Sequence, residues 1–132
     1  MATDTDTARR QAHAQLEYIK ELVGAYLSNP PIGGDGDTFE SIQEHPLSVE
    51  VRSDWVSPGT EKFEAGEYCI LLCTGGPAVR VTGTLGTYQY GNEPDTVRLE
   101  YQDWGTPWTE YWLTAAERDT VLTYARVFHY GQ

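Results

Sequence analysis

Three carboxylates lie close together in the C-terminal half of the chain: Glu100, Asp103 and Glu110. Paired carboxylates perform general acid–base chemistry when their surroundings separate their pKa values. The chain has 20 Asp and Glu residues, however, so carboxylates this close in sequence are expected by chance. These three residues alone do not indicate an enzyme.

The two cysteines are the other candidates for chemistry. A strand is expected around Cys69 and Cys73, where four residues span about 13 Å, too far for a disulfide. Both should be reduced, buried thiols. A nucleophilic Cys73 would require His45 or His129 to be brought to it by the fold. These histidines and His13 are scattered without metal-ligand spacing, so we expect neither a metal nor a cofactor.

The sequence Thr74-Gly75-Gly76-Pro77 has the glycine content of a phosphate-binding loop. It lacks the Lys-Ser/Thr ending of that motif, and a strand is expected after it where a helix should begin. A tight turn is the better interpretation, with the two glycines supplying positive φ angles. On the following strand, Arg80 is expected to pair with Glu100 or Asp103.

Residues 101–112 contain three Trp and two Tyr, which are residue types that dominate binding hot spots. One interpretation makes this segment a binding surface, and the other folds Trp104 and Trp108 back as lids on the sheet. The first predicts that at least one of the three Trp side chains is substantially exposed. The residues predicted to bind are Asp103, Trp104, Trp108, Glu110 and Tyr111.

The elements that must position these residues follow from the apolar periodicity. A three-to-four-residue period predicts an amphipathic helix, a period of two predicts strands, and Thr114 with Glu117 forms a capping box before a last helix. The expected helices are 6–28, a short turn 38–44 and 114–130; the expected strands are 47–52, 68–74, 78–85, 97–102 and 109–113.

These elements predict an α+β fold, an antiparallel sheet of four to five strands with the N-terminal and C-terminal helices packed on it. The strand at 47–52 should be half-buried, and the strand at 68–74 should be central and covered on both faces. Residues 91–94 are expected to form a turn. We expect residues 1–132 to form a single domain, with residues 29–37 as a flexible linker after the first helix.

The net charge of −11 and the pI of about 4.5 set the kind of partner. Such a field repels nucleic-acid backbones and anionic membranes and attracts basic surfaces. No short stretch gathers basic residues into a patch, and no apolar run reaches the length of a membrane span. We therefore expect a cytoplasmic protein without direct nucleic-acid or membrane binding.

Several segments resemble one family. They are residues 42–44, 46–53, 70–80, 99–109 and 122–131. Together they resemble small uncharacterised proteins carried by bacteriophages, prophages and plasmids. The resemblance implies a bacterial mobile element as the setting and assigns no catalytic residue.

Small acidic proteins of mobile elements commonly counter host defence, so the expected function is stoichiometric inhibition of the anti-CRISPR or anti-restriction type. The expected partner is a host protein complex with a basic surface, such as a nucleic-acid-binding defence complex. Two alternatives stay open: a small enzyme with an acidic or cysteine-centred site, and a structural or oligomerising phage protein. A non-enzymatic binder is favoured because no catalytic motif stands out.

Overall fold

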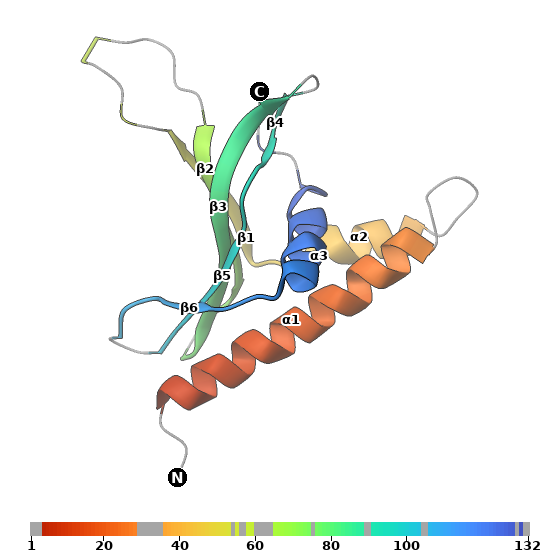
Figure 1. Cartoon of the computed structure of the whole chain (residues 1–132), viewed down its shortest axis with the longest axis vertical. Coiled ribbons are helices and arrows are strands. Elements are labelled where there is room, and N and C mark those ends of the chain that lie inside the picture. The colour runs from red at the N-terminus through yellow and green to blue at the C-terminus, as the bar shows by residue number, and fades with distance from the viewer. Residues whose placement is uncertain are drawn as a thin grey trace.

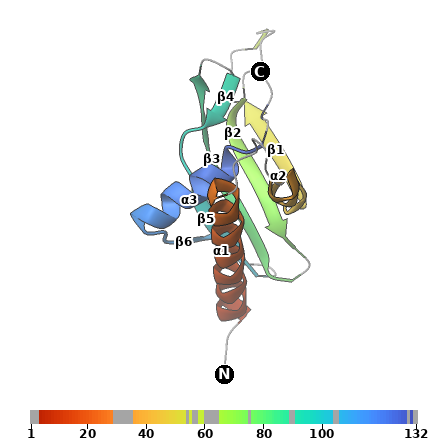
Figure 2. The ribbon, with the colours of Figure 1, turned by 90° about the vertical axis from the view of Figure 1, so that its right-hand side faces the viewer.

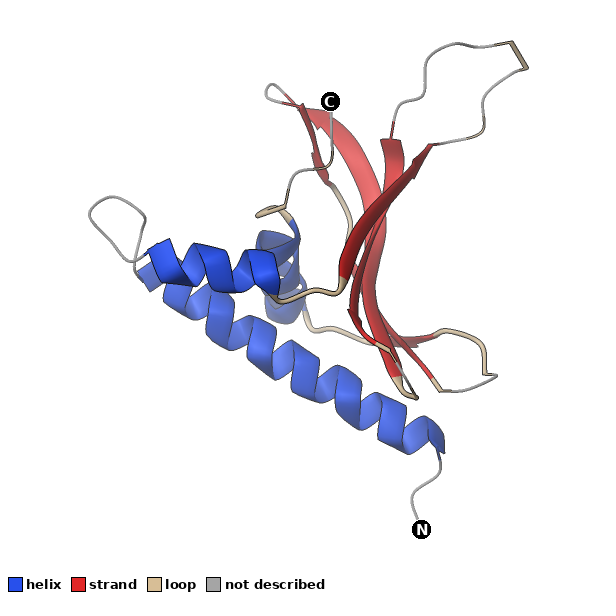
Figure 3. Ribbon diagram, turned by 180° about the vertical axis from the view of Figure 1, so that it is seen from behind, coloured by secondary structure: helices blue, strands red, loops and turns tan. Residues whose placement is uncertain are grey.

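A computed structural model shows two layers, with the helices on one face of a twisted antiparallel sheet (Figures 1 and 3). The structure describes residues 4–28, 36–53, 55, 58–59, 65–74, 76–88, 91–103, 106–128 and 130. Within these ranges the predicted α+β class is confirmed, and the N-terminal and C-terminal helices both pack against the sheet.

The long first helix, α1 (Asp4–Ser28), supplies one apolar stripe to the core. Its buried positions recur at three- and four-residue intervals, as an amphipathic helix requires: Ala8, Ala12, Leu16, Ile19, Leu22 and Val23. The stripe packs against the sheet and against the C-terminal helix α3 (Ala115–Ala125). In α3 the predicted capping box is present, with Thr114 and Glu117 each satisfying a backbone N–H of the other.

Six strands form the sheet, and all neighbouring pairs are antiparallel. The main order is β1-β2-β3-β5-β6, with β4 paired to the far end of the long strand β3. Figure 2 shows β1 and β6 at opposite edges of this sheet. The strand bounds are β1 Ser48–Ser53, β2 Ala65–Cys73, β3 Ala78–Tyr88, β4 Gly91–Pro94, β5 Arg98–Gln102 and β6 Thr109–Tyr111.

Several predicted element bounds were wrong. Strand β2 begins at Ala65 instead of residue 68, and strand β3 continues to Tyr88 instead of ending at residue 85. Residues 91–94 form strand β4 where a turn was expected, because backbone pairing with β3 continues through them. The second helix, α2 (Gly36–Glu44), begins inside the expected linker, of which residues 29–35 lie outside the described residues. Helix α3 ends at Ala125 instead of near Tyr130, because the next backbone bonds tighten to a three-residue spacing and the Tyr130 hydroxyl donates back to the Ala125 carbonyl.

Strand β2 was expected to be covered on both faces, and this is also wrong. Tyr68, Ile70 and Leu72 are buried under the helices, whereas Cys69 and Leu71 on the alternate positions are only half-buried. The continuous apolar run suggested cover on both faces, but all three helices lie on one side of the sheet (Figure 3). None of the described helices covers the opposite side.

Strand β1 departs from its predicted half-burial because it is an edge strand. Val49 packs against the core, but Leu47 and Val51 are 60% and 47% exposed. An edge strand has a neighbouring strand on one side only, so its alternating apolar side chains are less completely covered. Among the described helices, none has the length and apolarity needed to cross a bilayer.

Candidate functional site

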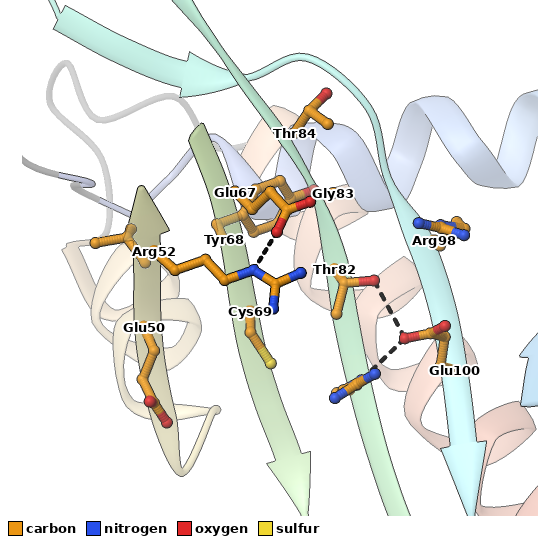
Figure 4. A pocket seen from close by; sticks show the side chains of 12 residues that line it. Glu50, Arg52, Glu67, Tyr68, Cys69, Thr82, Gly83, Thr84, Arg98 and Glu100 are labelled. Atoms are coloured by element: carbon orange, nitrogen blue, oxygen red, sulfur yellow. Dashed lines mark hydrogen bonds and ion pairs between the residues drawn. The ribbon is translucent and has the colours of Figure 1, made fainter. Parts of the chain in front are cut away.

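The face of the sheet opposite the helices, hereafter the open face, contains a shallow pocket of about 270 Å³. Figure 4 shows its side chains projecting from four neighbouring strands, with the helices behind them. Cys69 and Thr82 are register partners in the middle of the pocket, and longer charged side chains surround them. These charged residues are Glu50, Arg52, Glu67, Arg80, Arg98 and Glu100.

Strand register produces this gathering of charge. Arg52 lies opposite Glu67, Arg80 lies opposite Glu100, and Thr82 lies opposite Arg98. Three of the nine Lys and Arg residues of the chain therefore share one face, although they are 18 or more residues apart in the sequence. No short stretch of the sequence gathers basic residues, and the fold brings these three together from separate strands.

Arg80 makes the largest set of described side-chain contacts on the open face. Its Nε donates to Glu100 Oε1 at 2.9 Å, which confirms the predicted pair. Thr82 Oγ1 donates to the same carboxylate oxygen at 3.2 Å. The Arg80 guanidinium carbon lies 3.9 Å from the ring centroid of Trp108, in cation–π geometry. An aromatic ring, a cation and a carboxylate are thus held together at the surface.

The other two arginines differ in their partners. Arg52 pairs with Glu67 across β1 and β2, and this ion pair raises the pKa of the guanidinium. Arg98 is exposed and forms no ion pair with any residue that the structure describes. Its guanidinium retains all its donors for a binding partner, which makes it the least committed cation of the open face.

The two cysteines lie on opposite faces of the sheet. A β-bulge between Leu71 and Cys73 shifts the register, so Cys73 pairs with the buried Val79 and contacts Gln15 of α1. Cys69 faces the open pocket. Both are free thiols, as predicted, and burial raises the pKa of each, so both are protonated near neutral pH.

His45 lies on the helix side and joins three elements. Its Nε2 donates to Gln15 Oε1 at 2.8 Å, because that oxygen only accepts, and its Nδ1 then accepts from the Tyr124 hydroxyl at 2.7 Å. Burial lowers the pKa of this imidazole. Both ring nitrogens are occupied, so His45 is not available as the base that a nucleophilic Cys73 would require. The other histidine considered for that role, His129, lies outside the described residues.

The five residues predicted to bind do not form one surface. Trp108 and Glu110 lie on the open face, where Glu110 is the register partner of Glu100. Tyr111 turns to the helix side and its hydroxyl contacts His13 Nδ1 at 2.9 Å. Asp103 is 8% exposed and its backbone closes a turn with Thr106, while Trp104 lies outside the described residues.

Exposure of the aromatic segment was predicted and is found at Trp112, whose side chain is 79% exposed. Trp108 is half-buried against Arg80. Trp108 therefore packs back onto the sheet, as the lid interpretation predicts, but its ring covers Arg80 on the open face and not the core.

Comparison with protein-family models, curated proteins and solved structures found no match to this chain. The resemblance to proteins of mobile elements stays a prediction. The site must therefore be interpreted from its own chemistry.

That chemistry is suited to recognition. The open face offers an uncommitted guanidinium, a stacked Arg–Trp pair and carboxylates. The thiol in its pocket is protonated, and none of the described histidines lines the pocket. Among the described residues, no group of three or more His, Cys, Asp and Glu has the arrangement of a metal site. Sequence reasoning missed Arg52, Arg98 and Cys69 as site residues; their polar positions on alternating strands were the only available signal.

Proposed function

We propose that this protein acts by stoichiometric binding of a protein partner through the open face. The observation that carries the proposal is the stacked Arg80–Trp108 pair beside the unpaired Arg98 on a sheet face that no described helix covers. Trp and Arg are the residue types most enriched in binding hot spots. A rigid sheet also presents them with little loss of backbone freedom on binding.

An enzymatic function is less well supported by the same geometry. A cysteine nucleophile needs a lowered thiol pKa or a base within hydrogen-bond reach. Burial raises the pKa of both thiols. His45 lies on the same side of the sheet as Cys73, but both of its ring nitrogens are already hydrogen-bonded. One carboxylate oxygen of Glu100 already accepts hydrogen bonds from Arg80 and Thr82, which position it for structure.

The partner we propose is a protein complex with a net basic surface. The chain carries a net charge of −11, which accelerates its encounter with such a surface. In the complex, the arginines of the open face would pair with acidic side chains of the partner that border its basic surface. The finer proposal, a counter-defence inhibitor of a host nucleic-acid-handling complex, rests on the resemblance to proteins of mobile elements.

The test is affinity capture from bacterial cells that carry CRISPR or restriction systems, followed by measurement of stoichiometry with the purified partner. Arg98→Glu reverses the uncommitted charge of the open face and should abolish capture. Arg118→Glu makes the same change in net charge at an exposed position of helix α3, and this variant should capture the partner as the unmodified protein does. Equal capture by both variants would remove the open face from the proposal.

The salt dependence of the association rate separates long-range electrostatic steering from short-range contacts in the complex. The association rate of the unmodified protein should fall between low and physiological salt, because screening shortens the reach of its field. An unchanged association rate would reject electrostatic steering and leave the Arg–Trp surface as the main determinant. Plaque formation on a host with an active defence system then tests the inhibitor assignment itself.

A further inference from the structure

The outer edge of β1 carries an unusual share of the exposed apolar surface. Six large apolar side chains are exposed among the described residues, and three of them lie in or beside this strand. Leu47 precedes β1, Val51 lies within it and Trp55 follows it, at intervals of four residues. Their side chains are 60%, 47% and 103% exposed. Half of the exposed large apolar residues thus mark one sheet edge.

The backbone of this edge is also available. β1 pairs with β2 on one side, and no strand that the structure describes lies on its other side. Figure 2 shows it at the margin of the sheet. An edge strand of six residues presents unpaired N–H and C=O groups that pair readily with another strand.

The charges on β1 select one particular partner strand. Glu50 and Arg52 flank Val51 and project to the open face. If a second copy of β1 pairs antiparallel with Val51 opposite its own symmetry mate, Glu50 of each chain lies opposite Arg52 of the other. Shifting the pairing by two residues places Glu50 opposite Glu50 or Arg52 opposite Arg52. Parallel pairing in register also brings like charges together.

We propose that the protein self-associates as a two-fold symmetric dimer through antiparallel pairing of β1 with β1 of a second copy, centred on Val51. The pairing gives Glu50 a cationic partner, since in the described part of a single chain its only bond is a 3.5 Å contact from Ser48 Oγ. It also covers Val51 with its mate and brings Leu47 of each chain to the Trp55 end of the other.

The dimer goes beyond the proposed binding function and extends it. Pairing at β1 joins two sheets into one, with both open faces on the same side, because the Glu50 and Arg52 side chains must meet on one face. Two copies of the charged pocket then lie side by side, which gives a bivalent surface for a repetitive partner.

The experiment measures mass against concentration by sedimentation, on the full chain without any partner. The parent protein should show a concentration-dependent monomer–dimer equilibrium. Glu50→Arg alone places four arginines at the seam, and Arg52→Glu alone places four glutamates there, so each variant should be monomeric. Mixed together, the two variants place every Arg opposite a Glu and should form a heterodimer.

Controls separate this pairing from general charge attraction. Glu21→Arg and Arg118→Glu make the same charge changes at exposed positions of helices α1 and α3, and each variant should dimerise like the parent. Val51→Lys should be monomeric and should still unfold cooperatively, with a melting temperature that no longer depends on concentration, whereas Val51→Ile should remain dimeric. A parent that is monomeric at every concentration overturns the proposal. A mixture of Glu50→Arg and Arg52→Glu no more dimeric than its components overturns the register.

Discussion

The two faces of the sheet use the same strands for opposite purposes. On the helix face, Val79, Val81 and Leu99 are fully buried, and the polar groups there are satisfied in pairs such as Tyr124 with His45. On the open face, the alternate residues of those strands are charged and partly exposed. Stability therefore depends on one face, and the other is free to carry recognition at little cost to folding.

The largest difference between the faces should appear when one aromatic residue is truncated on each. Tyr124 is fully buried and its hydroxyl bonds His45, so Tyr124→Ala should lower the free energy of unfolding by about 3–5 kcal/mol. Trp108 lies over Arg80 at the surface, so Trp108→Ala should cost about 1 kcal/mol. Chemical denaturation of both variants measures the difference, and equal losses would contradict the division between the faces.

A pair of glycine substitutions compares the packed interior of the sheet with the solvent side of helix α1. Gly83 is buried, and a Cβ there would clash with the Thr96 carbonyl oxygen and approach the Tyr68 ring to 2.8 Å. Gly83→Ala should destabilise the protein by about 1–3 kcal/mol because neighbouring backbone must shift. Gly24 on the exposed side of α1 has open space around it, so Gly24→Ala should stabilise by about 0.5–1 kcal/mol. Thermal melts of the two variants should move in opposite directions.

Acid should weaken the helix face through His45. Burial lowers its folded-state pKa below the ordinary value of 6.5, so the unfolded chain takes up this proton more readily. The contribution of neutral His45 to the free energy of unfolding is complete above pH 6.5 and is lost as the pH falls through its folded-state pKa. His45→Gln should therefore show a smaller loss of melting temperature between pH 7 and pH 5 than the parent. The exposed His13→Gln is the matched control and should keep the parental loss.

The smallest effects should come from the open-face carboxylates, and they should differ in sign. Glu100→Gln removes the charge that pairs with Arg80, at a cost of about 1 kcal/mol or less. Glu110 is the cross-strand partner of Glu100, so Glu110→Gln relieves a like-charge contact and should stabilise by about 0.2–1 kcal/mol. Urea denaturation at low salt resolves both changes. Loss of stability in both variants would mean that Glu110 has a favourable partner.

Local sequence predicted the elements well, since the stripe of α1, the Thr114–Glu117 capping box and the Arg80–Glu100 pair each depend on short-range pattern or neighbouring strands. It failed where tertiary arrangement decides. The apolar run of β2 gave no indication that every described helix packs on one side, and no local pattern indicated the bulge after Leu71 that places the two cysteines on opposite faces.

The candidate site was predicted in part for the same reason. Trp108 and Glu110 are on the open face, but strict alternation sends Tyr111 to the opposite side, and a contiguous segment cannot form one side of a sheet. Arg98 belongs to the site through its register with Thr82 across two strands, which no local pattern contains.

The central claim, that the open face binds and the helix face folds, is tested most directly by the affinity of the purified partner for a double variant, Arg98→Glu with Trp108→Ala. The dissociation constant should rise by about a hundredfold or more, as expected for loss of two hot-spot residues, while the protein remains folded. The variant Arg118→Glu should bind as tightly as the parent. A folded double variant with the parental dissociation constant would contradict the account.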